Sequence, residues 1–125
     1  MDKYAWYEEY PTNPSSFVLN GFMYSLLGLY DLAQASNNGQ VEKLLENGLG
    51  SLVALVPMFD TGSGTTYDLR HLTMGGAPKL ARWDYHSTHV NLLFVLSTIF
   101  PEEKILLETG NRWQNYMSGQ KAEHN

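Results

Sequence analysis

The chain contains no cysteine among its 125 residues and no long apolar run. Without cysteine it has no disulfide, no thiolate nucleophile and no cysteine-ligated metal. No apolar run approaches the roughly 20 residues needed to span a bilayer, so we expect no membrane contact from this chain. Basic residues are scarce as well. Eight Lys and Arg against thirteen Asp and Glu leave a net charge of −5, which argues against nucleic acid as a partner.

Hydrophobic residues make up 43% of the sequence and aromatic residues 13%, which is typical of a folded globular protein. No internal repeat or linker divides the chain. We therefore expect one domain over residues 1–125, in which residues 118–125 form a polar tail.

Four segments have the apolar periodicity of helices, at residues 16–34, 41–56, 88–99 and 101–117. Pro14 and Pro101 are typical of the first turn of a helix, and Pro57 is expected to end the second helix. The sequence SNNG at residues 36–39 is typical of a turn, which would make the first two helices an antiparallel hairpin. Gly21 and Gly28 interrupt the first helix, and we expect them to mark close contact with a neighbouring helix.

The first and third predicted helices are apolar around most of their circumference, whereas the second and fourth are amphipathic. This alternation favours two layers, with buried helices covered by outer ones. We therefore predict an all-α fold, a partial (α/α) barrel or toroid built of helical hairpins. Two hairpins cannot close such a ring, so we expect further elements or a second copy to complete it.

The stretch at residues 61–89 is irregular and holds three of the four histidines together with Arg70, Lys79 and Arg82. Segments of this kind, held by a rigid scaffold, are where binding and catalytic residues tend to lie. The fixed charges of residues 66–91 leave one net positive charge, although the whole chain is acidic. The sequence thus predicts a polar site between helices that is suited to an anion.

Several kinds of chemistry are poorly supported. His86 and His89 are spaced to share a helical face, but no third ligand has the spacing typical of a metal site, so we predict no metal. The sequence TGSGT at residues 61–65 lacks the lysine and the preceding strand of a phosphate-binding loop, and no hydrolase nucleophile motif is present. Acid–base chemistry by phenol and carboxylate groups remains. The groups available for it are Glu9, Tyr10, Tyr67 and Tyr85.

Structural roles compete with these functional ones. The aromatic segment YAWYEEYPT at residues 4–12 is also typical of a strap packed on the end of a helix. Arg70 and Arg82 have Asp68 and Asp84 nearby as ion-pair partners, which would use part of their charge.

Three segments in order resemble the C-terminal part of the D-glucuronyl C5-epimerases, enzymes that modify heparan sulfate and heparin. They are YEEYPTNPSSFVLNGFMYSLLGLYDL at residues 7–32, DTGSGTTYDLRH at 60–71 and ARWDYHSTH at 81–89. The resemblance implies the helical catalytic portion of a larger isomerase. Such an enzyme converts D-glucuronate to L-iduronate in N-sulfated heparosan by removing and returning a proton at carbon 5, without a cofactor. The remaining barrel helices and the β-rich region of the family are absent, so we expect little activity from this chain alone.

By their places in these motifs, the resemblance implies that the catalytic groups are Glu9, Tyr10, Tyr67 and Tyr85. We expect Glu9 and Tyr85 on opposite faces of the sugar, with Tyr10 and Tyr67 assisting. The resemblance implies that the residues contacting substrate are Asn20, Tyr24, Arg70, Lys79, Arg82, Trp83 and His86. It further implies an anionic polysaccharide as the partner, the Golgi lumen as the location, and a homodimer for the full enzyme.

Two other functions remain open at this point. A non-catalytic glycan-binding helical domain could use the same cleft without moving a proton. A polysaccharide lyase would begin with the same abstraction at carbon 5 and then eliminate, leaving an unsaturated sugar that absorbs in the ultraviolet.

Overall fold

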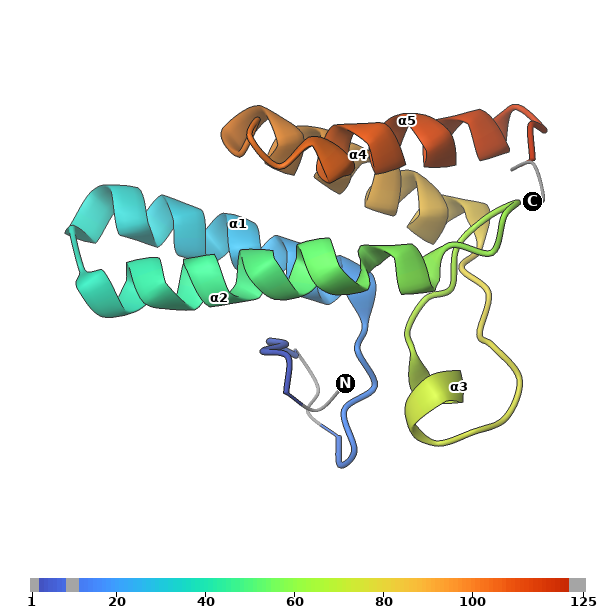
Figure 1. The fold of residues 1–125 in the computed structure, drawn as a ribbon, viewed down its shortest axis with the longest axis horizontal. Helices are drawn as coiled ribbons and strands as arrows, with labels where there is room; N and C mark the ends of the chain where they lie inside the picture. The colour runs from blue at the N-terminus through green and yellow to red at the C-terminus, as the bar shows by residue number, and fades with distance from the viewer. Residues whose placement is uncertain (1–2, 9–11, 122–125) are drawn as a thin grey trace.

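The computed structural model describes residues 3–8 and 12–121. Within these residues the chain forms helices and no strand, which confirms the all-α prediction. The elements in order are α1 (Leu19–Ser36), α2 (Gly39–Leu55), the short 3-10 helix η1 (Val56–Phe59), α3 (Arg70–Thr73), α4 (Trp83–Ile99) and α5 (Lys104–Met117). Helices α1 and α2 form one hairpin, α4 and α5 form a second, and α1 packs against α4 (Figure 1). The arrangement into a barrel or toroid stays a prediction.

The turn predicted at residues 36–39 is confirmed. Asn37 ends α1 in the left-handed conformation (φ 52°), which asparagine tolerates better than most residues. Asn38 caps the start of α2, and its side chain accepts a hydrogen bond from the N–H of Gln40 at 2.9 Å. Each of the two asparagines thus satisfies one helix end, and the chain reverses in a short turn.

Three predicted helix starts are wrong. α1 begins at Leu19 and not after Pro14, because the residues before it pair with the central stretch: Leu69 N–H donates to Ser16 C=O at 2.9 Å. α5 begins at Lys104, three residues after Pro101. α4 begins at Trp83, ahead of the predicted residue 88, and this places the WDYH motif on a helix.

The helices come close together at two glycines that the sequence did not single out, whereas the space around the predicted Gly28 is open. A Cβ on Gly48 of α2 would lie 2.6 Å from the Leu26 side chain and 2.8 Å from the Tyr7 ring. A Cβ on Gly110 of α5 would lie 2.9 Å from the ring of Phe94. In each hairpin the missing side chain therefore lets the partner helix come near.

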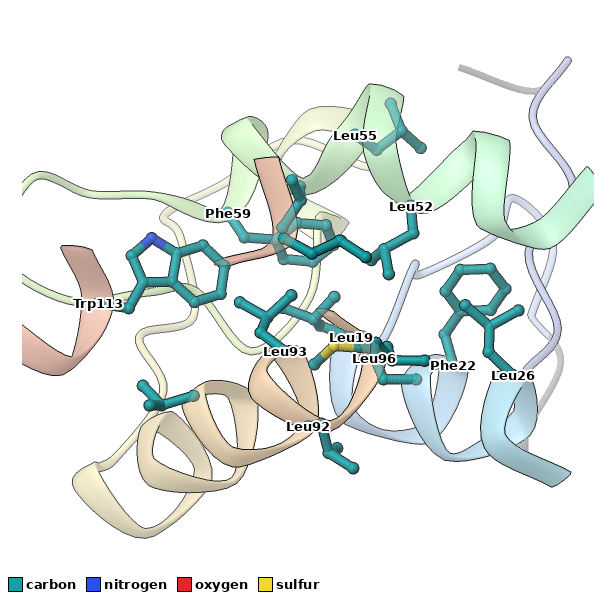
Figure 2. Packing of buried hydrophobic residues seen from close by; sticks show 14 of the residues in the cluster. Leu19, Phe22, Leu26, Leu52, Leu55, Phe59, Leu92, Leu93, Leu96 and Trp113 are labelled. Carbon is teal, nitrogen blue, oxygen red and sulfur yellow. The ribbon is translucent and has the colours of Figure 1, made fainter. Parts of the chain in front are cut away.

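One hydrophobic cluster joins the two hairpins (Figure 2). Phe22 of α1, Leu52 of α2 and Leu96 of α4 are each fully buried within it. Trp113 of α5 and Phe59 of η1 extend the cluster, and both are also fully buried. Each such side chain contributes about 1.5–3 kcal/mol by its removal from water. Among the residues described, none of the helices combines the length and apolar character that a membrane span requires.

The central stretch between η1 and α4 is held by backbone hydrogen bonds on both sides. The N–H of Tyr67 donates to the C=O of Lys79 and that of Ala81 to the C=O of Thr65, both at 2.8 Å. On the other side, the N–H of Leu19 donates to the C=O of Tyr67 at 3.2 Å. Residues 65–67 therefore lie between the start of α1 and residues 79–81, in a defined position rather than as a free loop.

Candidate functional site

Two tyrosines from different elements meet beside the start of α4. Tyr67 belongs to the extended segment 65–67, and Tyr85 lies in the first turn of α4. Their ring centroids are 4.9 Å apart with the planes at 71°, an edge-to-face contact. Tyr85 is 37% exposed, so a ligand can reach its ring. We call Tyr67 and Tyr85 the tyrosine pair.

Two cations lie against this pair. The Nζ atom of Lys79 is 4.4 Å from the centroid of the Tyr67 ring, and the Cζ atom of Arg82 is 6.0 Å from that of Tyr85. Both distances fall within the range of cation–π contact. The backbone bond between Tyr67 and Lys79 explains the first contact, because it places the two residues side by side. The tyrosine pair thus has positive charge beside it, which an anion site requires, and the anion site itself stays a prediction.

The ion pairs expected for the two arginines are present. Arg70, the first residue of α3, lies 3.6 Å from the carboxylate of Asp68, which is fully buried, while the guanidinium remains about half exposed. Arg82 lies 3.3 Å from Asp84 at the surface, and its hydrogen bond holds the pKa of the Asp84 carboxyl below the ordinary value. Exposed pairs of this kind contribute little to stability. Both arginines therefore keep N–H groups open to a ligand.

The remaining substrate-contact candidates lie on α1 and α4. Trp83 is 54% exposed, and its ring meets that of His86 edge-on at 5.0 Å. Asn20 follows Leu19 at the start of α1, which adjoins Tyr67, and its Oδ1 atom is buried with no hydrogen-bond partner among the residues described. Tyr24 lies one turn further along α1 and is mostly exposed.

Glu9 and Tyr10 lie outside the described residues. The residues just before them are held firmly, since the Glu8 carboxylate accepts the N–H of Phe17 at 2.7 Å. Trp6 stacks on the Phe22 ring at 3.8 Å, and its Nε1–H donates to the C=O of Val18. The structural interpretation of this segment, an aromatic strap packed on a helix, is therefore confirmed for residues 4–8.

The structure places His86 differently from the expectation of substrate contact. Its side chain has no exposed surface. The Nε2 atom is 2.7 Å from the C=O of Trp113, and the Nδ1 atom is 2.9 Å from the Thr65 hydroxyl. A ring that is buried and bonded at both nitrogens cannot contact a sugar, so His86 lies behind the site and supports it.

The sequence suggests two roles for His89, a possible metal ligand and a cation beside an anion, and gives no signal for a role of Thr65. The Nδ1 atom of His89 lies 3.0 Å from the same Thr65 hydroxyl that contacts His86. Burial lowers the pKa of His89 to about 3, and the nearby His86 adds to this effect. The shared helical face of the two histidines was visible in their spacing, but their common partner was not.

A second polar cluster, also missed, lies on α5. The Arg112 Nε atom is 2.9 Å from the Asp60 carboxylate and 2.7 Å from the Tyr116 hydroxyl, which itself donates to Asp60 at 2.8 Å. Burial raises the pKa of the Tyr116 hydroxyl. These three residues tie α5 to the beginning of the central stretch. No group of three His, Asp or Glu side chains in the described ranges is arranged to hold a metal ion.

Comparison with known proteins bears on this geometry. A family model described as the D-glucuronyl C5-epimerase C-terminus matches residues 1–115, nearly the entire chain. The chain belongs to this epimerase family. The D-glucuronyl C5-epimerase of Caenorhabditis elegans is 50% identical to it over 132 residues, which cover 96% of this chain and 21% of the relative.

A more distant similarity is to an uncharacterized protein of Methanocaldococcus jannaschii, 34% identical over 65 residues, which cover 52% of this chain and 21% of that protein. The chain thus spans about a fifth of the length of the relatives it matches. The region matched by the epimerase family includes the tyrosine pair, its cations and the buried histidines.

Proposed function

We propose that this chain supplies the C-terminal catalytic region of a heparosan-N-sulfate-glucuronate 5-epimerase. Such an enzyme converts D-glucuronate to L-iduronate within heparan sulfate and heparin. Membership of the C5-epimerase family supports an isomerase. The observation that carries the proposal is the tyrosine pair, with its rings 4.9 Å apart and the Lys79 ammonium 4.4 Å from one of them.

The chemistry requires groups of this kind. Removing the hydrogen of carbon 5 as a proton leaves the electron pair of the C–H bond, which delocalises into the adjoining carboxylate, so positive charge near that carboxylate stabilises the intermediate. Arg70, Lys79 and Arg82 supply that charge. A phenolate or carboxylate takes the proton from one face, and a second group, a phenol or a carboxylic acid that holds a proton, returns one to the other face to form the new C–H bond.

We assign the proton transfer on one face to Tyr85, because its ring is accessible, and place Tyr67 beside it in an assisting role. Glu9 is proposed for the opposite face, with Tyr10 assisting. Exposed Trp83 and Tyr24 offer flat apolar surfaces on which sugar rings stack, and Asn20, at the start of α1 beside Tyr67, is kept as a proposed contact. The proposed partner is therefore an anionic polysaccharide, N-sulfated heparosan. By family membership we extend the proposal to the Golgi lumen and to a homodimer of the whole enzyme.

Tyr85→Phe tests the proposal in the native protein, by which we mean the polypeptide that contains these residues as the source cell produces it. The measurement is incorporation of solvent deuterium at carbon 5 of N-sulfated heparosan. Removing the phenol oxygen should lower the rate by about 10²–10⁴-fold, the usual contribution of a positioned acid–base group. Binding of the polysaccharide should stay nearly unchanged, because the ring remains.

Tyr30→Phe is the matched control, since Tyr30 packs against Phe100 away from the tyrosine pair. Exchange in the Tyr85→Phe protein at the control rate would refute the proposed role of Tyr85. Binding without exchange in the unsubstituted protein would instead indicate a glycan-binding domain. An increase in ultraviolet absorbance during the reaction would indicate a lyase.

A further inference from the structure

The Thr65 hydroxyl lies at a junction of three elements. It belongs to the central stretch, and its Oγ1 atom is 2.9 Å from His86 Nδ1 and 3.0 Å from His89 Nδ1, both on α4. Through His86 Nε2 the same chain of bonds continues to the C=O of Trp113 on α5. Thr65 is 1% exposed and both histidines are fully buried, so this network has no contact with solvent.

The partners determine the order of donation. The Trp113 carbonyl only accepts, so His86 Nε2 carries a proton, and in the neutral ring Nδ1 is an acceptor. Thr65 therefore donates its hydroxyl proton to His86 and accepts from the Nδ1–H of His89. The low pKa of His89, about 3, agrees with this order, since that ring is neutral. A lone pair, rather than an N–H, is left at His89 Nε2, which has no partner among the residues described.

The backbone connects this network to the tyrosine pair. Residues 65–67 are extended beside residues 79–81, and side chains two apart in an extended segment point to the same side. Thr65 and Tyr67 accordingly both face α4. There Thr65 meets His89, and Tyr67 meets Tyr85, which lies one helical turn before His89 on the same side of α4.

We propose that Thr65 is a positioning residue: its hydroxyl, held between His86 and His89, sets the register of residues 65–67 along α4 and so holds Tyr67 against Tyr85. Losing the hydroxyl removes the side-chain link between this segment and α4, so the segment, still bonded through its backbone to residues 79–81, can shift relative to the helix. The effect on catalysis rests on the proposed function, whereas the hydrogen-bond network does not. A displacement of about 1 Å at a reacting group is enough to slow a reaction by roughly 100-fold.

Thr65→Val tests this inference, because valine keeps the shape of threonine and removes the hydroxyl. In the native protein kcat for deuterium exchange at carbon 5 of N-sulfated heparosan should fall by about 10- to 100-fold, with KM nearly unchanged. Thr65→Ser retains the hydroxyl and should restore most of the rate. Thr66→Val is the matched control, since the neighbouring Thr66 hydroxyl is buried with no hydrogen-bond partner in the described part of the chain, and its removal should leave kcat unaltered.

Equal kcat in Thr65→Val and Thr66→Val, or failure of Thr65→Ser to restore the rate, would overturn the proposal. If Thr65→Val does not fold, His89→Asn and His89→Leu replace it. The amide of asparagine can still donate to Thr65 and should preserve exchange, whereas leucine cannot and should lose it. Equal rates in these two variants would also overturn the proposal.

A measurement independent of catalysis separates this inference from the proposed function. ¹⁵N NMR of the histidine rings should show His89 protonated at Nδ1 and His86 at Nε2, and Thr65→Val should shift the Nδ1 signals of both. Other tautomers would overturn the network even in an active enzyme. These tautomers in a protein without exchange activity would refute the proposed function and, with it, the catalytic effect of Thr65.

Discussion

His86 and His89 show how burial changes what a histidine does. Their spacing is compatible with metal ligands or with contacts to an anion, yet both rings are fully buried around one threonine hydroxyl. A buried imidazole loses the hydration that stabilises its charged form, so the pKa of His89 falls to about 3 from the ordinary 6.5. These two side chains therefore have a structural role, although their residue type suggested ligand binding.

This pKa predicts how stability depends on pH. Between pH 6.5 and 3 the unfolded chain binds a proton at His89 that the folded chain does not, so the free energy of unfolding should decrease as the pH is lowered. The contribution of this one group to the slope of the free energy of unfolding against pH is about 1.4 kcal/mol per pH unit. Urea unfolding at several pH values from 7 to 5 measures it, above the range in which most carboxylates titrate.

His89→Asn is the control, because the amide can donate to Thr65 and does not titrate. The free energy of unfolding of this variant should change less with pH. The slope should be smaller by up to about 1.4 kcal/mol per pH unit, which corresponds to one bound proton. Parallel curves for the two proteins would show that His89 is not the group responsible.

Close packing at the element scale depends on single glycines. In the first hairpin, Gly48 of α2 faces Leu26 and Tyr7 with no room for a methyl group. Because Leu26 is fully buried, it has little space to move away. The side chain of Tyr7 is also fixed, since its hydroxyl donates to the C=O of Leu44 at 2.7 Å.

Gly48→Ala should therefore destabilise the protein by about 1–3 kcal/mol, the usual cost of overpacking. Gly50→Ala, two positions further along the same helix, is the matched control, because the space around Gly50 is open. It should stabilise the protein by up to about 1 kcal/mol through better helix propensity. Thermal unfolding of both variants checks this, and a Gly48→Ala protein as stable as the control would contradict the packing.

At the scale of the whole molecule, the site is open to solvent. Tyr85 is 37% exposed, and its neighbours Trp83 and Leu80 are 54% and 66% exposed. Proton removal from carbon is favoured where water is excluded, because charges there act more strongly on one another. This chain matches 21% of the C5-epimerase of C. elegans, and we expect the rest of such an enzyme to cover this surface.

The 125 residues alone are thus expected to exchange the hydrogen at carbon 5 at least about 100-fold more slowly than the C. elegans relative. Deuterium incorporation into N-sulfated heparosan measures both rates. Circular dichroism of the isolated chain provides the control for folding. A folded 125-residue chain with a rate near that of the relative would contradict this expectation.

Local patterns in the sequence were enough to predict the four long helices, though not η1 or α3, together with the turn at residues 36–39 and the amphipathic face of α5, because periodicity and turn chemistry depend on neighbouring residues. The motifs also indicated the family. The helix starts depend instead on contacts with distant residues. The backbone hydrogen bond between Ser16 and Leu69, for example, keeps residues 16–18 out of α1.

Only the tertiary structure decided which polar residues belong together. Tyr67 lies on an extended segment and Tyr85 on a helix, and their contact depends on backbone bonds to residues 79–81 and on the packing of α4. The burial of His86 has the same origin, because Thr65 and Trp113 come to it from distant parts of the chain. The sequence by itself determined the residue types and the local conformation, whereas contacts between distant segments arise only when the core assembles and brings them together.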